Sequence, residues 1–275
     1  MDYIQAVVLG VVEGLTEFLP VSSTGHLTIA EKLLGLDVAD KGVTAYTAVI
    51  QMGAIVAVIV YFWTDIWRIA RAWVTGLAKP ELRGTLDHRM GWYVIVGSIP
   101  IGIIGLLAKD VITGPLRSLW VVATALIVWS AVLLLAEQRG RQRRGERDLS
   151  LRDAVVVGLV QCVALIPGVS RSGATISTGL LLGLDRVSAT RLSFFLSIPA
   201  LLAAGLYELP DALSSDISVG QTVVGTLVSF VVAYASVAWL LKFVAGNSIG
   251  KFVPYRVALG VVLLVVLGTG LMSAT

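Results

Sequence analysis

The segment VVEGLTEFLPVSSTGHL, positions 11–27, places carboxylates, hydroxyls and a histidine in an otherwise apolar part of the chain. Glu13 and Glu17 are four residues apart, so on a helix their side chains lie on one face. Two carboxylates this close repel each other unless they share a cation or a proton. The pair therefore predicts either a divalent cation, Mg²⁺ or Ca²⁺, or one protonated carboxyl. The structural alternative is pairing with a basic group at the membrane surface.

A turn rich in hydroxyl groups follows the two glutamates. Ser23 lies three residues before His26, a spacing that lets hydroxyl and imidazole meet if the turn begins a helix. A serine hydroxyl needs such a base before it can act as a nucleophile. Ser22, Ser23 or Thr24 alone would also serve as a helix cap, and a single histidine is often only part of a core. As a group we interpret them as a nucleophile and base, with Ser22, Thr24 and Gly25 binding substrate.

A second motif, PGVSRSG at positions 167–173, adds a permanent positive charge. Arg171 stands between Ser170 and Ser172, with Gly173 next, where a new half-helix is expected to begin. A guanidinium fork, hydroxyl groups and helix N-terminal amides together form an anion site, and phosphate is the anion they fit best. The structural alternative is that Arg171 pairs with Glu13 or Glu17 as a bridge.

The two motifs lie in related segments of the chain. A shift of 148 residues aligns positions 6–26 with 154–174, with identical residues at Ala6, Val7, Val8, Gly10, Val12, Val21, Ser22 and Gly25. In the second copy Gln161 replaces Glu13 and Leu165 replaces Glu17. The alignment predicts an internal repeat whose halves have divided the chemistry, one acidic and nucleophilic, the other anion-binding.

Composition indicates the class of protein that must position these residues. Hydrophobic residues make up 56% of the chain, charged residues only 14%, and the mean hydropathy is +0.87. These values are typical of an integral membrane protein. The formal charge of +3 is too small to indicate a nucleic-acid partner. Cys162 is the single cysteine and is expected to serve in packing, and no removable signal segment is expected at the N-terminus.

Six segments are long and apolar enough to cross a bilayer, which takes roughly 20 helical residues. They are 44–63, 90–108, 118–137, 187–207, 219–241 and 253–272. Two further apolar regions, 3–35 and 153–184, are broken near the middle by Pro, Gly and Ser. Broken helices at membrane depth need protein or a watery cavity around them, so both regions predict re-entrant helix pairs whose tips meet. Gly53, Gly97, Gly102 and Gly105 fit helices that pack closely.

The topology follows from counting the spans. Each copy of the repeat precedes three spans, so the two copies are expected to lie in opposite orientations in the membrane. Most of the 21 basic residues fall in loops that this topology places on one side, which we assign to the cytoplasm. The sequence thus predicts an all-α membrane protein with one membrane domain over 1–275. Its parts are repeat 1 at 1–137, a basic cytoplasmic loop at 138–152 and repeat 2 at 153–275.

VVEGLTEFLPVSSTGHL together with PGVSRSGAT closely resembles the two signature segments of the undecaprenyl-diphosphate phosphatase family, also called bacitracin-resistance protein. The resemblance covers both motifs, their order and separation, and the chain length. It implies a hydrolase of the bacterial cytoplasmic membrane, with its site open to the outside, that converts undecaprenyl diphosphate to undecaprenyl phosphate. This activity recycles the lipid carrier for peptidoglycan synthesis and confers resistance to bacitracin.

Carried over by position, the resemblance assigns the acidic pair to Glu13 and Glu17, the essential histidine to His26 and the phosphate-binding arginine to Arg171 beside Ser170. Its hydroxyl turn falls on Ser22, Ser23 and Thr24. In the mechanism we favour, Ser23 attacks the terminal phosphorus while Glu17 and His26 transfer protons and Arg171 stabilises negative charge. The rival mechanism has no phosphoserine: Glu13 and Glu17 hold the divalent cation, and water or His26 attacks.

Two other classes of function remain open at this point. A polyprenyl-phosphate transporter would use the same inverted repeats, broken helices and anion site. It has no evident need for Glu13, Glu17, Ser23 and His26 together. A purely structural membrane subunit leaves the intramembrane charges unexplained. The sequence leaves the number of protomers open, with a homodimer among the options.

Overall fold

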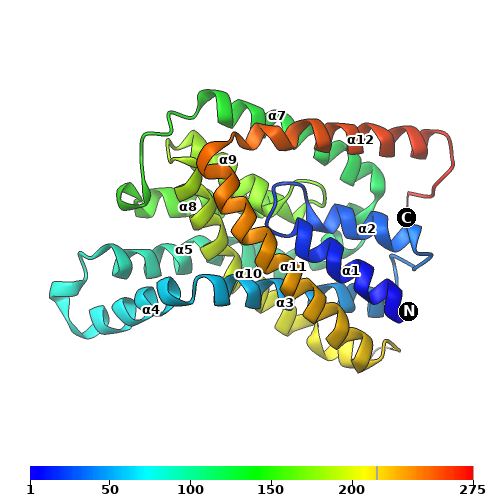
Figure 1. Cartoon of the computed structure of the whole chain (residues 1–275), viewed down its shortest axis with the longest axis horizontal. Coiled ribbons are helices and arrows are strands. Elements are labelled where there is room, and N and C mark those ends of the chain that lie inside the picture. Colours follow the sequence, from blue (N-terminus) through cyan, green and yellow to red (C-terminus); the bar gives the residue numbers. More distant parts are fainter. Residues whose placement is uncertain (215, 275) are drawn as a thin grey trace.

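The computed structural model describes residues 1–214 and 216–274, which form helices joined by short segments (Figure 1). Within these residues, six helices are long and apolar enough to span a membrane, which confirms the predicted number of spans. They are α3 (Lys41–Tyr61), α5 (Leu86–Leu107), α7 (Leu119–Arg139), α10 (Arg186–Leu213), α11 (Val219–Gly246) and α12 (Val253–Gly268). Several begin earlier or end later than the apolar segments. Caps in the polar flanks decide these ends: the Asp40 side chain, for example, accepts from the Val43 amide and begins α3.

Both broken regions form pairs of short helices. The first pair is α1 (Tyr3–Thr16) and α2 (Ser23–Leu33), and the second is α8 (Leu151–Gln161) and α9 (Arg171–Leu181), joined through a 3-10 turn, η4 (Cys162–Leu165). None reaches the roughly 20 residues of a span, and the two members of each pair pack against each other. Entry of the two pairs from opposite sides of the membrane stays a prediction.

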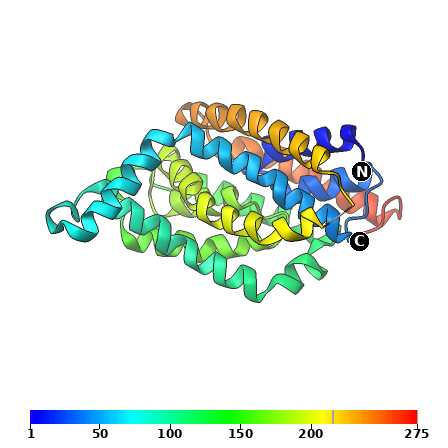
Figure 2. The ribbon, with the colours of Figure 1, turned by 90° about the horizontal axis from the view of Figure 1, so that it is seen from below.

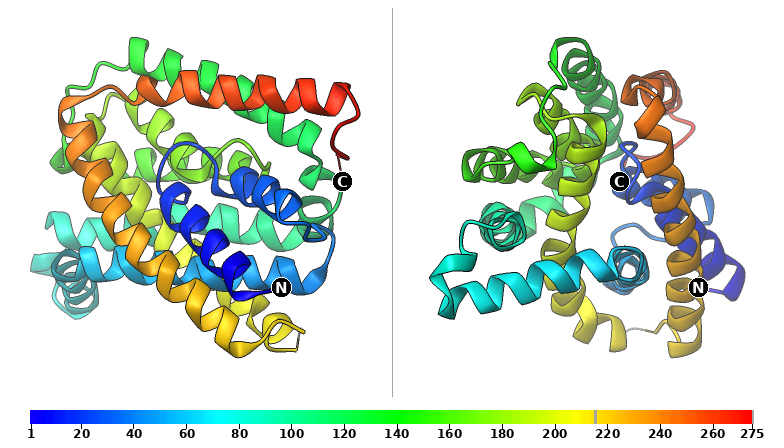
Figure 3. Two further views of the ribbon diagram at one scale, coloured as in Figure 1. Left: turned by 45° about the vertical axis from the view of Figure 1, so that its right-hand side comes forward. Right: turned by 60° about the vertical axis from the view of Figure 1, so that its left-hand side comes forward.

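The two halves of the chain pack by exchanging partners. Helix α1 packs on α11 of the second half, and α8, which corresponds to α1 in the repeat, packs on α5 of the first half. Helices α7 and α12 lie side by side along one edge of the bundle, and α3 lies against α10 and α11 (Figure 1; Figure 3, left). The largest core cluster takes residues from both halves, including Phe18 beside the first break and Phe194 in α10. This packing brings the two breaks together at the centre of the bundle.

The segment at 64–89, which separates the first two predicted spans, is largely helical. Helix α4 (Trp63–Ala78) leaves the line of α3 and extends beyond the end of the bundle (Figure 2; Figure 3, right). It buries Ile69 and Gly76, seven residues apart on one face, while Trp63 and Trp67 stay exposed. A search for uninterrupted apolar spans misses such a helix because its arginines interrupt the run. Short turns η1 (Pro80–Leu82), η2 (Pro115–Arg117), η3 (Glu146–Asp148) and η5 (Ile249–Phe252) and helix α6 (Lys109–Thr113) complete the connections.

Close helix packing occurs at two of the four glycines that we singled out. A Cβ at Gly53 would meet the carbonyl oxygen of Thr226 in α11, and one at Gly97 would lie 2.7 Å from Leu196 in α10. Among the described residues, a Cβ at Gly102 would meet nothing within 4 Å, and one at Gly105 would meet only Leu165 at 3.8 Å. Gly53 and Gly97 therefore fit the predicted role, and the prediction for Gly102 and Gly105 is wrong because that part of α5 faces no close neighbour.

Candidate active site

Ser22 and Ser170 begin the second helix of each broken pair with the same unusual backbone. Both have a φ of 77°, a left-handed value that costs energy for a residue with a side chain. Each hydroxyl caps its helix by accepting the amide N–H of Gly25 at 3.4 Å or Gly173 at 3.1 Å. The Ser22 hydroxyl also accepts the amide N–H of Gly168 at 3.0 Å, across the two pairs. The two tips are therefore in direct contact, as we predicted.

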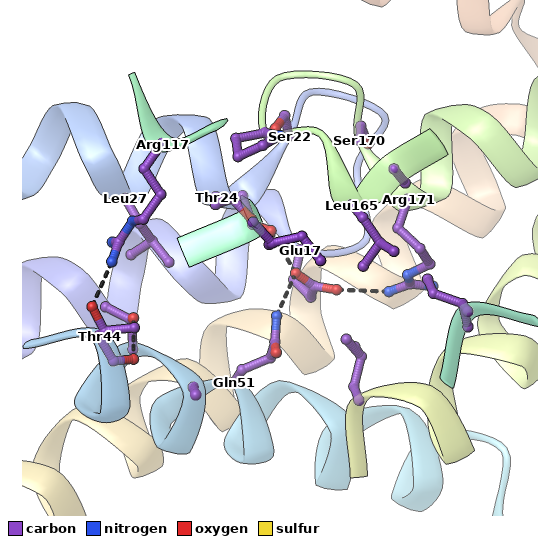
Figure 4. Close-up of a pocket in the computed structure, with 18 of the residues that line it drawn as sticks. Glu17, Ser22, Thr24, Leu27, Thr44, Gln51, Arg117, Leu165, Ser170 and Arg171 are labelled. Atoms are coloured by element: carbon purple, nitrogen blue, oxygen red, sulfur yellow. Dashed lines mark hydrogen bonds and ion pairs between the residues drawn. The ribbon is translucent and has the colours of Figure 1, made fainter. Parts of the chain in front are cut away.

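Glu17 lies at the centre of this contact (Figure 4). Its Oε2 accepts a hydrogen bond from Ser23 Oγ at 2.5 Å and another from Gln51 Nε2 of α3 at 3.1 Å. Its Oε1 accepts from Arg171 at 2.7 Å. The Glu17 and Arg171 side chains are only 4% and 9% exposed, so their charges are largely removed from solvent. One carboxylate thus connects the first tip, the second tip and a spanning helix.

Arg171 is held from two sides. One terminal nitrogen donates to Glu17 and the other donates to the carbonyl oxygen of Ser193 in α10 at 3.0 Å. The third nitrogen, Nε, is buried and has no hydrogen-bond partner among the residues described. The bridge between Arg171 and Glu17, which we kept as the structural alternative, is therefore present. The fork therefore keeps one donor unused in this state, and the Arg171 side chain lines the cavity beside Glu17.

Glu13 lies one helical turn before Glu17 and is completely buried. Within the described part of the chain, neither of its carboxylate oxygens has a hydrogen-bond partner. A buried carboxylate without a partner is strongly unfavourable, so the site must supply a proton or a cation. Either remedy agrees with the expectation from the Glu13–Glu17 spacing.

His26 and Ser23 are not joined by a hydrogen bond in the described structure. Its Nδ1 donates to the carbonyl oxygen of Ser22 at 2.7 Å, and its Nε2 accepts from the hydroxyl of Tyr255 in α12 at 2.6 Å, with the two rings stacked 5.6 Å apart. This tautomer follows because a carbonyl oxygen can only accept. Both ring nitrogens are occupied, so the expected approach of Ser23 to His26 is not seen. The Ser23 hydroxyl instead donates to Glu17.

The remaining predicted binding residues divide into two groups. Ser22, Thr24 and Ser170 line the cavity beside Glu17. Ser172 is completely buried, and its hydroxyl donates to the carbonyl oxygen of Leu19 at 2.8 Å, which ties the second tip to the first. Gly25 and Gly173 supply amides to the two serine caps. In this state Ser172, Gly25 and Gly173 therefore shape the tips, and their contact with substrate stays a prediction.

A cavity of about 270 Å³ opens beside this cluster. Glu17, Ser23, Gln51 and Arg171 form a polar part of its wall, and Arg117 with Thr44 forms another on the far side of Glu17 (Figure 4). The apolar part of the lining consists of Leu27, Ala48, Ile101, Ile112, Ala164, Leu165, Pro167 and Leu201. Such a cavity suits a ligand with an anionic head and a hydrocarbon chain.

The model of the bacitracin resistance protein BacA family matches residues 6–262, which include both tips and all six spans except the last residues of α12. The chain belongs to the BacA family. It is 60% identical over 270 residues to undecaprenyl-diphosphatase 1 of Streptomyces avermitilis, with 98% of each chain covered. It is 59% identical over 271 residues to undecaprenyl-diphosphatase 1 of Frankia alni, again with 98% of each covered. It is 56% identical to the undecaprenyl-diphosphatase of Acidothermus cellulolyticus, with 100% of each covered.

The structure of this BacA family member adds cavity residues that the motifs alone did not indicate. Arg117 donates to Thr44 Oγ1 at 2.5 Å and forms a longer ion pair of 3.4 Å with Glu31, whose side chain is 1% exposed. Arg117 directly precedes the expected span at 118–137, and Glu31 lies near the end of the broken region at 3–35, so neither stands out from the motifs. For Gln51 the available signal is a lone amide in an apolar segment, which by itself fits ordinary pairing between helices; the structure places it on Glu17.

Proposed function

We propose that this chain is an undecaprenyl-diphosphatase that removes the terminal phosphate of undecaprenyl diphosphate and so recycles the lipid carrier for cell-wall synthesis. The names of its relatives support this activity, and the description of its family supports a part in bacitracin resistance. The observation that carries the proposal is the position of Glu17, which contacts both Ser23 and Arg171 beside a cavity with polar and apolar walls.

In the proposed first step the Ser23 oxygen attacks the terminal phosphorus. Glu17 already accepts the Ser23 hydrogen at 2.5 Å and takes the proton as the Oγ–P bond forms. The bond between that phosphorus and the bridging oxygen breaks, and undecaprenyl phosphate leaves. Water then attacks the phosphoserine and the Oγ–P bond breaks. The Ser23 oxygen takes back the proton held by Glu17, and inorganic phosphate leaves with the protons of the water. His26 is given no proton transfer here because both its ring nitrogens are engaged.

Arg171 is proposed to stabilise the charge that develops on the phosphoryl oxygens. It carries a permanent charge, and its Nε is the free donor of the fork. When Glu17 accepts the proton of Ser23, its negative charge is lost and its hold on Arg171 weakens. The fork then becomes available to the phosphoryl group at the moment when charge builds up there. The N-termini of α2 and α9, each an 11-residue helix, add to the positive potential.

A divalent cation fits Glu13 and Glu17. Carboxylate oxygens are the donors that Mg²⁺ and Ca²⁺ prefer, and Glu13 has two buried oxygens without a partner. No group of three or more His, Cys, Asp or Glu residues in the described part of the chain could hold a metal, so phosphate oxygens or water would complete the coordination. When bound, the cation would offset the charge of the diphosphate. The carboxylates themselves would position it.

The lipid substrate and the apolar helices agree with a multi-pass membrane protein. We propose that this is the bacterial inner membrane and that the cavity faces the outside, as the distribution of basic residues predicts. A homodimer is not part of the proposal because all residues of the proposed chemistry come from one chain. A transporter is not favoured, because it gives no role to the hydrogen bond between Ser23 and Glu17.

Phosphate release from undecaprenyl diphosphate by the purified protein in detergent tests the proposal. Wild type should release phosphate in the presence of Mg²⁺ or Ca²⁺, and Ser23→Ala and Arg171→Ala should lower the rate by at least about 100-fold. Substrate labelled in its terminal phosphate should leave label on Ser23 after rapid quenching. Absence of release by wild type under all divalent ions would reject the hydrolase. Release that survives Ser23→Ala would reject the phosphoserine and support attack by water.

A further inference from the structure

The first turn of helix α12 carries an arginine that none of the motifs includes. Arg256 is 0% exposed, and its side chain is the largest of those fully buried in the described structure. Arg171, the arginine of the second tip, is paired with Glu17. Arg256 forms no ion pair within 4.0 Å among the residues described. A buried arginine without a carboxylate partner is costly in a membrane protein and indicates a specific role.

The hydrogen bonds of Arg256 reach both broken tips. One terminal nitrogen donates to the carbonyl oxygen of Pro20 in the first tip at 2.7 Å. The other donates to the carbonyl oxygens of Gly168 at 2.9 Å and Val169 at 3.1 Å in the second tip. These carbonyls belong to the non-helical turns between half-helices. At membrane depth such carbonyls need a donor, and the planar fork of one guanidinium serves both turns at once.

The third nitrogen anchors the arginine to the neighbouring span. Arg256 Nε donates to Ser130 Oγ of α7 at 3.1 Å, while the Ser130 hydroxyl donates to the carbonyl oxygen of Leu126 at 2.6 Å. Arg256 is therefore fixed between α7 and α12 and cannot follow a movement of one tip alone. Separation of the tips would break hydrogen bonds on one side of the fork.

The positions of Ser23 and Arg171 depend on how Arg256 holds the two tips together. Pro20 precedes Ser22 and Ser23 by two and three residues, and Val169 precedes Arg171 by two. Gly168 is also the residue whose amide donates to Ser22 across the tips. Its carbonyl and its amide are thus bound on opposite sides, by Arg256 and by Ser22.

The charge of Arg256 adds a second effect. Its partners are neutral carbonyl and hydroxyl oxygens, so the positive charge is not cancelled locally, unlike that of Arg171 beside Glu17. In the poorly polarisable interior of the membrane, such a charge acts over longer distances than it would in water. It makes the tips more favourable for a phosphate anion before any direct contact is formed.

We infer that Arg256 is a positioning residue of the phosphate site, which locks the two tips in register and supplies an uncancelled positive charge behind them. The inference rests on the proposed function for its substrate. Arg256 does not line the cavity, so it acts on the substrate only through other groups. Its two effects should therefore separate: the fork sets the geometry for turnover, and the charge sets the affinity for the diphosphate.

Two substitutions separate the fork from the charge. Arg256→Lys keeps the charge but offers no planar fork, and Arg256→Gln keeps a donor but loses the charge. We expect Arg256→Lys to bind undecaprenyl diphosphate within about threefold of wild type and to lose at least about tenfold in kcat, because small displacements of reacting groups are costly. We expect Arg256→Gln to lose at least about tenfold in affinity as well. Binding is measured by calorimetry and turnover by phosphate release.

A milder pair of variants guards against loss of folding. Ser130→Ala removes the acceptor of Arg256 Nε, and we expect a three- to tenfold lower kcat, roughly the value of one hydrogen bond. Ser236→Ala is the matched control, a buried serine of α11 that donates only within its own helix, to the Val232 carbonyl. It should leave kcat within about twofold. Size-exclusion elution and thermal unfolding in detergent show which variants are folded.

The outcomes are distinct. Equal losses of affinity in folded Arg256→Lys and Arg256→Gln would overturn the role of charge, and unchanged kcat in Arg256→Lys and Ser130→Ala would overturn the positioning role. If both Arg256 variants unfold, the comparison of Ser130→Ala with Ser236→Ala decides. If wild type binds the diphosphate but releases no phosphate, the proposed function fails while the binding comparison still tests the charge.

Discussion

Glu17 and Arg171 form a buried ion pair, 2.7 Å long, that joins two segments 154 residues apart in the chain. The pair holds the carboxylate in position to accept the hydrogen of Ser23. It also neutralises the arginine in this state. In the proposed mechanism, protonation of Glu17 would release Arg171, so the contact would link nucleophile activation with anion binding.

Glu17→Gln should lower kcat/KM for phosphate release by about 10²- to 10⁴-fold, since an amide can neither take the Ser23 proton nor pair with Arg171. Glu146→Gln is the matched control. Glu146 of η3 pairs with Arg191 of α10 and does not line the cavity, so its replacement should change kcat/KM less than about twofold. A Glu17→Gln enzyme with near-normal kcat/KM would remove Glu17 as the base.

His26 and Tyr255 make a prediction about the pH–rate profile. Because both His26 nitrogens are engaged, His26→Gln should lower the rate at every pH without moving the acidic limb of the profile. Tyr255→Phe, which keeps the stacked ring and loses the hydroxyl, should behave likewise with a smaller loss. Disappearance of the acidic limb in His26→Gln would instead establish His26 as a titrating base.

Glu13→Gln should weaken the binding of a divalent cation. Removal of a carboxylate ligand should raise the Mg²⁺ or Ca²⁺ concentration for half-maximal binding by at least about tenfold. Calorimetric titration of the metal alone into chelator-treated protein measures this without relying on activity. An unchanged titration, with Glu146→Gln as reference, would show that Glu13 is kept neutral by a proton.

Gly14 lies in α1, which contains Glu13 and is capped by Glu17, at a point where α1 packs closely on α11. A Cβ at this position would lie 2.7 Å from the Ser229 carbonyl oxygen and 2.8 Å from Val232 Cβ, so α1 would have to move away from α11. Gly14→Ala should lower the free energy of unfolding by about 1–3 kcal/mol, seen as a lower thermal midpoint in detergent. Gly102→Ala should not lower it, because a Cβ there would meet no described atom within 4 Å. Equal midpoints for the two variants would contradict this packing.

The internal repeat shows how far a local pattern can lead. Ser22 and Ser170 are paired by the 148-residue shift, and the structure gives them the same φ and the same capping role. Similar residues at the two breaks favour the same backbone conformation, so this similarity was predictable from the sequence. The opposite orientation of the copies in the membrane is still a prediction.

Other features were out of reach of the sequence. Helix α4 lies in a segment whose apolar residues alternate with arginines, so it could not be recognised as a span. The spacing of Ser23 and His26 allowed a contact on one helix. The His26 imidazole instead forms a hydrogen bond with Tyr255, which lies 229 residues away in the chain. Arg256 stands among ordinary apolar residues of the last span, and nothing nearby in the chain indicates its partners.

The sequence by itself determined the membrane class, the number of spans, the two breaks and the residue types that could act on a phosphate. These depend on hydrophobicity and on short motifs, which are local properties of the chain. Only the tertiary structure decided that Glu17 accepts the hydrogen bond of Ser23, that His26 pairs with Tyr255 and that Arg256 donates to both tips. Partners of buried polar groups are chosen by distance, and helix packing alone brings residues from opposite ends of the chain within hydrogen-bond reach.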